Sequence, residues 1–137
     1  MMKSIPVWKQ ELSDGVHAAR LASLYCCAPA ETASEAARYA GVLDGLEKPF
    51  GSHAEAGLYS APGRTEIGGN HTDHQHGRVL AGSVNIDMIA AAAPNDKNQL
   101  RVQSEGYDLC VIDLNDLEAR KEEENTTASL LRGECAA

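Results

Sequence analysis

The chain has 137 residues and a formal net charge of −8, and 43% of its residues are hydrophobic and 23% charged. This length is typical of a single domain with one core, and the proportions are ordinary for a globular protein. The negative charge disfavours nucleic acids and anionic membranes as partners, because neutralising phosphates takes clustered Lys and Arg. No apolar run has the length of a signal peptide or a membrane span, and we expect a cytoplasmic protein.

Two amphipathic helices are expected in the first third of the chain. Apolar residues recur at helical spacing between Val7 and Cys27, and Pro29 ends that segment. The sequence "TASE", Thr32–Glu35, is a capping box and predicts the start of a second helix. Gly45, Pro49 and Gly51 are expected to close it.

The hydrophobic period changes to that of strands after residue 56. Gly57–Pro62 predicts a short strand that Pro62 stops. In residues 84–88, apolar side chains alternate with Asn85 and Asp87, which is typical of a strand with one polar face.

The second half of the chain predicts more strands and a last helix. Pro94–Asn98 is a turn cluster, and the sequences "QLRVQS" and "LCVIDL" follow it as two strands, bent at Gly106. A new helix begins at Thr126 or Thr127 and is only about two turns long. Helices followed by mostly antiparallel strands predict an α+β fold.

The expected organisation is one domain over 1–137. A helical lead-in covers 1–55, a polar glycine-rich stretch covers 56–83, strands cover 84–118, and the start of a cut helix covers 126–137. The short last helix suggests that the chain is the leading part of a longer protein.

The four cysteines do not predict a metal site or a disulfide. Cys26, Cys27, Cys110 and Cys135 lack the CxxC spacing of thiolate sites, and the adjacent pair is poorly placed for a mutual bridge. We expect free thiols.

The stretch Ser60–Ser83 stands out, because it gathers two arginines, two acids and three histidines between glycine-rich turns. One interpretation is a metal site on His71, His74 and His76 with Asp73. The i, i+4 histidine spacing of a helical zinc site is absent, so a loop would have to bring these ligands together. A solvated polar loop is the plainer alternative.

A phosphate-binding loop is a further alternative. Gly68 and Gly69 could present backbone N–H groups to an anion, but no Lys-Ser or Lys-Thr follows them as in a nucleotide P-loop. The glycine pair is better explained by a backbone turn or a close ligand approach.

A small polyol site fits all the residue types in the stretch. Asn70, His71 and Asp73 lie within four residues, bracketed by Gly69 and Gly77. Amide, imidazole and carboxylate groups pair with hydroxyls as donors and acceptors. Arg64 adds a fixed cation that can hold a phosphate or a carboxylate through two parallel bonds.

The sequence "APGRTEIGGNHTDHQHG" resembles the signature P-G-R-x-N-[LI]-I-G-E-H-x-D-Y of galactokinases, in the family that also holds homoserine, mevalonate and phosphomevalonate kinases. Pro62 to Asp73 match it without a gap. The resemblance implies the N-terminal portion of a sugar-1-kinase with an α/β N-terminal domain, which transfers the γ-phosphoryl group of ATP to galactose with Mg²⁺.

The resemblance also assigns roles to residues. Arg64 matches the catalytic arginine beside the reacting hydroxyl, and His71 and Asp73 match two sugar ligands. Asn70 stands where the family has a sugar-binding Glu, which exchanges a charge-assisted bond for a neutral one. Glu66 replaces an Asn of the signature, and His74 replaces its Tyr.

The second signature of the family, a P-x-G-x-G-L-S-S-S-A loop that opens a helix onto the ATP phosphates, does not occur in the 137 residues. We therefore expect this chain to bind the sugar and to be inactive alone. Because Asn70 and Glu66 depart from the family, a kinase-like sugar sensor that transfers no phosphoryl group remains the alternative.

Overall fold

The computed structural model describes residues 1–52, 55–69 and 72–137, and of Asp73 only the backbone. The chain divides into two compact units, Met1–Ala93 and Pro94–Ala137. The helices and antiparallel strand pairs found in them confirm the predicted α+β class. Each unit is described by itself.

The first unit begins with two helices where one was predicted. α1 (Ile5–Ser13) and α2 (Ala18–Tyr25) are separated by a turn, so the prediction of a continuous helix over 7–27 is wrong. Gly15 lies in this turn with a φ of +71°, a backbone conformation that favours glycine and does not continue a helix. The apolar period runs across the turn because both helices contribute to the same core.

The third helix, α3 (Ala33–Phe50), starts where the capping box predicted it. Its capping bond is different, because the hydroxyl of Thr32 donates to the carbonyl of Pro29 at 2.8 Å instead of accepting from the helix. α3 also continues past Gly45 and includes Pro49 in its last turn, so only Gly51 closes it as expected. The short 3₁₀ turn η1 (Pro29–Glu31) precedes it.

The core of the first unit lies among these three helices. Its buried side chains come from all of them and from the residue before the first strand: Ile5, Trp8, Leu12, Leu21, Tyr25, Tyr39, Leu43, Leu46 and Ala56. The indole N–H of Trp8 donates to the buried carbonyl of Ala56 at 2.8 Å. This bond and the bridge between Lys3 and Ala56 join the start of the chain to the start of the sheet.

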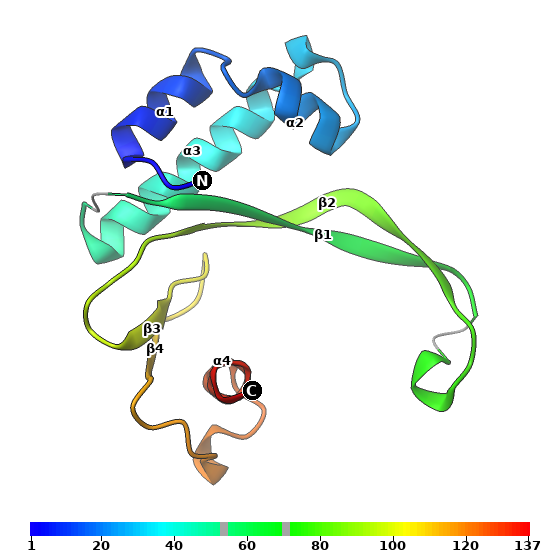
Figure 1. The fold of residues 1–137 in the computed structure, drawn as a ribbon, viewed down its shortest axis with the longest axis vertical. Helices are drawn as coiled ribbons and strands as arrows, with labels where there is room; N and C mark the ends of the chain where they lie inside the picture. Colours follow the sequence, from blue (N-terminus) through cyan, green and yellow to red (C-terminus); the bar gives the residue numbers. More distant parts are fainter. Residues whose placement is uncertain (53–54, 70–71) are drawn as a thin grey trace. The chain divides into compact units, whose positions relative to one another are not determined.

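A long hairpin completes the first unit. β1 (Gly57–Gly68) pairs antiparallel with β2 (Leu80–Ala92). In Figure 1 the three helices lie along one side of this hairpin, and its tip extends beyond them. The prediction that Pro62 ends the first strand is wrong. A two-stranded hairpin has only edge strands, where a residue without an N–H is tolerated, and a register shift follows directly between Pro62 and Arg64.

The two faces of the hairpin do not follow the usual division into apolar inside and polar outside. Leu58, Ile89 and Ala91 pack against the helical core. Asp87 shares their face, and its side chain is only 3% exposed. Ile86 and Met88, the apolar partners in the alternation, are 76% and 79% exposed. The strand was predicted correctly, but its acidic residue is the buried one.

The second unit contains a smaller hairpin and a helix. β3 (Gln99–Val102) pairs antiparallel with β4 (Cys110–Asp113), in agreement with the two predicted strands. The 3₁₀ turn η3 (Lys121–Glu123) leads to α4 (Thr127–Ala136), whose N-cap Thr126 accepts a bond from the N–H of Ser129 at 3.3 Å. Arg132 of α4 is 4% exposed and donates to both carboxylate oxygens of Glu123 at 2.8 Å.

All four cysteines are free thiols, as predicted. Among the described helices, none combines the length and the apolar character that crossing a bilayer requires.

Candidate functional site

The predicted site falls at the tip of the first hairpin. Arg64 lies on β1 opposite Ser83 of β2 and is exposed. Asn70 and His71 lie outside the described residues. Asp73 is the first residue of the 3₁₀ turn η2 (Asp73–Gln75), and its side chain is not described. The convergence of these four groups on one ligand therefore stays a prediction.

The described part of the tip shows a tightly closed turn. The carbonyl of Thr72 accepts the N–H of Gln75 at 3.0 Å and the N–H of Gly77 at 2.8 Å. The hydroxyl of Thr72 donates to the carbonyl of Gly69 at 2.8 Å. Thr72 therefore ties the start of the connection to its end, on both sides of the predicted sugar ligands.

Two glycines are required by this closure. Gly69 has a φ of +116°, and a Cβ there would lie 2.5 Å from the carbonyl oxygen of Arg78. A Cβ on Gly77 would lie 2.0 Å from the hydroxyl oxygen of Thr72 and 2.7 Å from its carbonyl oxygen. Both separations are shorter than any side chain permits, so the glycines are there for close backbone approach. This accounts for the glycines that bracket the polar residues.

A buried polar network lies near the middle of the hairpin, where Asp87 of β2 is opposite Pro62 of β1 and contacts the helices. One carboxylate oxygen of Asp87 accepts from the hydroxyls of Tyr25 at 2.6 Å and Ser60 at 2.5 Å. Its other oxygen accepts from the guanidinium of Arg38 at 2.9 Å. The hydroxyls of Tyr25 and Tyr39 are 3.1 Å apart.

The network favours an ionised Asp87. Burial raises the pKa of its carboxyl, but the bonds from Ser60, Tyr25 and Arg38 together hold the pKa below its usual value. Burial and the bond to Asp87 raise the pKa of Tyr25, which keeps that phenol protonated as a donor. The sequence interpretation missed this network. Its only sequence signal is an acid between Ile86 and Met88 in a strand, and the alternation alone does not say which face is covered.

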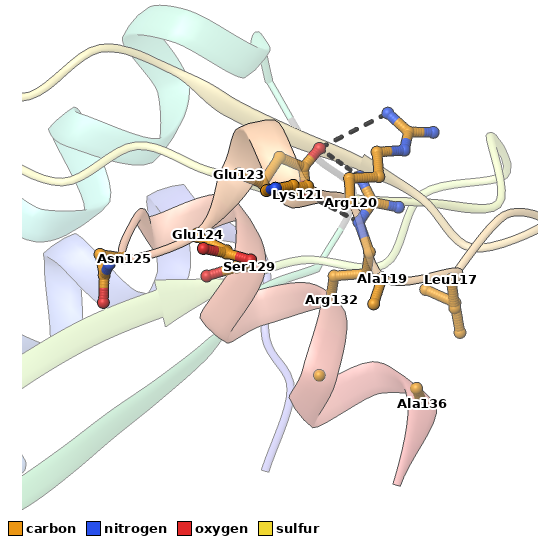
Figure 2. Close-up of a pocket in the computed structure, with 11 residues that line it drawn as sticks. Leu117, Ala119, Arg120, Lys121, Glu123, Glu124, Asn125, Ser129, Arg132 and Ala136 are labelled. Carbon is orange, nitrogen blue, oxygen red and sulfur yellow. Dashed lines mark hydrogen bonds and ion pairs between the residues drawn. The ribbon is translucent and has the colours of Figure 1, made fainter.

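The second unit contains an open groove of about 700 Å³ beside α4, shown in Figure 2. It holds three basic residues, Arg120, Lys121 and Arg132. Arg132 is bonded to Glu123, and Arg120 to Asp116 at 2.5 Å. Carboxylates already engage both guanidinium groups, and we assign the groove no ATP contact.

The metal interpretation receives no support from the described side chains. No group of three His, Cys, Asp or Glu side chains close enough to hold a metal ion occurs among them. His71 and the side chain of Asp73, two of the four predicted ligands, fall outside that description.

Fold and tip together define a class: an α+β unit in which helices hold the base of a β-hairpin and glycines constrain a polar turn at its tip. Residues 46–94, which include this whole hairpin, match the family model described as the galactokinase galactose-binding signature. The predicted resemblance to galactokinases is therefore confirmed for this stretch.

Curated proteins agree with the family match. The chain is 35% identical over 85 residues to a galactokinase of Ligilactobacillus salivarius. This alignment covers 60% of this chain and 22% of that protein. It is 34% identical over 71 residues to a galactokinase of Streptococcus suis, over 50% of this chain and 18% of that protein. A galactokinase of Lacticaseibacillus casei is 33% identical over 66 residues, over 48% and 17% respectively. The matches thus span about a fifth of the relatives' length. No solved structure matches the chain with comparable significance.

Proposed function

We propose that this chain is the sugar-binding part of a galactokinase-type enzyme, with galactose as its ligand. The observation that supports this most is the galactose-binding signature over residues 46–94, which coincides with the hairpin and its glycine-constrained tip. In this proposal Asn70, His71 and Asp73 pair with sugar hydroxyls. Arg64 lies beside the anomeric hydroxyl that receives the phosphoryl group.

The proposed chemistry explains why the tip is built as a rigid turn. Phosphoryl transfer requires little covalent participation of the protein, so positioning and charge stabilisation dominate the catalysis. A guanidinium on a paired strand is a fixed charge that offsets the negative charge developing near the transferred group. Thr72 bonds to Gly69 on one side and to Gln75 and Gly77 on the other, which fixes the backbone of the described part of the tip.

We further propose that ATP and Mg²⁺ bind to other parts of a longer enzyme. Both guanidinium groups of the groove beside α4 are already bonded to carboxylates, and the glycine pair of the signature lacks the Lys-Ser or Lys-Thr of a P-loop. Bound ATP supplies the transferred phosphoryl group. In this proposal the residues of this chain place the sugar, and Arg64 offsets the negative charge that develops near the transferred group.

Titration calorimetry of galactose into the 137-residue chain tests the proposal. We expect saturable binding of galactose, weaker binding of its C4 epimer glucose, and loss of galactose binding in Arg64→Ala and Asp73→Ala. Asp108→Ala, at an exposed acid of the second unit, is the matched control and leaves the affinity unchanged. Equal affinity for both sugars, or unchanged binding in the two site variants, contradicts the proposal.

The alternative of a sugar sensor is motivated by Glu66, an exposed residue of β1 where the family signature has an Asn. Both proposals predict galactose binding, so the decisive assay is transfer. A longer protein containing this chain is supplied with ATP, Mg²⁺ and galactose. Formation of galactose 1-phosphate supports the kinase, and binding of both ligands without that product supports the sensor.

A further inference from the structure

The buried carboxylate of Asp87 joins three segments that are far apart in the sequence. Its bonds reach Tyr25 at the end of α2, Arg38 in α3 and Ser60 in β1. With its side chain 3% exposed, it is shielded from water, and Tyr25, Arg38 and Ser60 all donate to it. A buried charge with several such bonds holds its partners in one geometry, because losing any of them leaves a desolvated group unsatisfied.

The direction of the bonds makes the arrangement specific. The single proton of the Tyr25 hydroxyl goes to Asp87, so the hydroxyl of Tyr39 has to be the donor in the bond between the two tyrosines. Tyr39 and Arg38 are neighbours in α3, and both contribute to the network. The carboxylate therefore determines which way the hydroxyls of α2 and α3 point.

The network lies immediately before an irregular point of the signature strand. Asp87 is opposite Pro62, and the register then shifts before Arg64 pairs with Ser83. Pro62 has no N–H to add to the ladder. The regular ladder of β1 is therefore interrupted between Pro62 and Arg64, and Ser60, which bonds to Asp87, lies two residues before this interruption.

We propose that Asp87 is a positioning residue for the sugar site: its carboxylate clamps β1 to α2 and α3 through Ser60, and so fixes the strand from which Arg64 reaches the ligand. The proposal has two parts. The first, that Asp87 fixes the position of β1, is measured without any ligand. The second, that this position matters for sugar binding, rests on the proposed function.

The test compares Asp87→Asn with Leu12→Ala in the 137-residue chain. Asparagine keeps the shape but turns an N–H₂ group toward the donors. Leu12→Ala removes a buried side chain of α1, 5% exposed, and leaves the clamp intact. Both variants are studied at a temperature where circular dichroism shows them folded. Ser60→Ala replaces Asp87→Asn if the latter does not fold, because it removes only the tie to β1.

Hydrogen exchange tests the first part of the proposal, that Asp87 fixes the position of β1. We expect the amides of residues 60, 61 and 63–66 to exchange about tenfold faster in the clamp variant than in Leu12→Ala, the change that corresponds to one lost bond to a charged group. Equal exchange in the two variants overturns the inference.

Galactose affinity tests the second part of the proposal, that the position of β1 matters for sugar binding. We expect binding about tenfold weaker in the clamp variant and unchanged in Leu12→Ala. Equal losses in both variants show a merely structural role and overturn the inference. If the unmodified chain does not bind galactose, the proposed function fails, while exchange still decides whether Asp87 fixes the strand.

Discussion

The base and the tip of the first hairpin are parts of the same two strands, yet they are held in different ways. At the base, Leu58, Ile89 and Ala91 pack on a core of three helices, and a buried carboxylate ties strand to helices. At the tip, the described residues Arg64–Gly68 are exposed, and their shape comes from backbone bonds and glycines. The base is therefore held by side-chain packing and buried bonds, and the described part of the tip by backbone bonds and close backbone approach.

The largest expected effect comes from breaking the base. Leu43 of α3 is completely buried, so Leu43→Ala removes packing from the centre of the core. We expect the free energy of unfolding to fall by about 2–5 kcal/mol. Urea denaturation followed by circular dichroism measures it.

Met88→Ala is the matched control for that experiment, because Met88 is 79% exposed on the other face of the hairpin. We expect its cost to stay within about 0.5 kcal/mol. Similar costs at the two positions would contradict the division between a covered and an uncovered face.

The next largest effect comes from breaking the tip. In Gly69→Ala a methyl group would have to lie against the backbone of Arg78, and the residue would keep a φ of +116°. Strain of this kind costs about 1–3 kcal/mol, and the connection moves to relieve it. We expect galactose affinity, measured by calorimetry, to be lost while the helical content of the chain is kept.

The neighbouring glycine provides the control. A Cβ on Gly68 meets no atom within 4 Å, and its φ is not in the left-handed range. Gly68→Ala is therefore expected to bind galactose with nearly unchanged affinity. Equal losses at both positions would show that the turn does not depend on close backbone approach.

A third experiment sharpens the comparison through pH. The pKa of Asp87 is lowered in the folded chain, where Tyr25, Ser60 and Arg38 donate to its carboxylate, with Tyr39 behind Tyr25. A carboxyl with a lowered pKa stabilises the fold above its unfolded pKa of about 3.9, and this contribution is lost as the pH falls through the folded value. We expect the unfolding midpoint of the chain to drop more steeply below pH 4 than that of Asp87→Asn.

Glu11 also titrates in this unit with a lowered pKa, because Lys3 and His17 bond to its carboxylate. It contributes equally to the chain and to Asp87→Asn, so the difference between the two curves isolates Asp87. Parallel curves between pH 2 and 5 would show that folding does not lower the pKa of Asp87.

The sequence predicted the elements of this fold better than their ends. Strands and helices were predicted from hydrophobic periodicity, and each predicted segment contains an element of the expected kind. The turn at Gly15 was missed because residues on both sides of it face one core, so the period did not reveal the break. The sequence predicts that the first strand ends at Pro62, because a proline is not accepted in a central strand. In the structure β1 is an edge strand, which accepts it.

A sequence motif predicted the residues of the candidate site. It did not predict the buried network of Asp87 in the same hairpin. The gapless match around Arg64 and Asp73 names residue types that one kind of chemistry uses, and the family comparison agrees with it. The network of Asp87 depends on which face of β2 the helices cover. That is a property of long-range packing between α2, α3 and the hairpin, which a local pattern does not contain.

The smallest expected effect comes from Arg64→Lys at the tip. Lysine keeps the positive charge but lacks the planar fork that forms two parallel bonds. Since galactose 1-phosphate offers a phosphate to that fork and galactose does not, we expect the variant to bind the phosphorylated sugar about fivefold more weakly, the effect of one hydrogen bond of about 1 kcal/mol. The affinity for galactose should change less, and the free energy of unfolding should stay within about 0.5 kcal/mol, because Arg64 is exposed.

Calorimetry with both sugars and urea denaturation measure these quantities. Equal losses for the two sugars would show that Arg64 does not face the phosphorylated position, and a large loss of stability would show that the tip, like the base, helps to hold the fold.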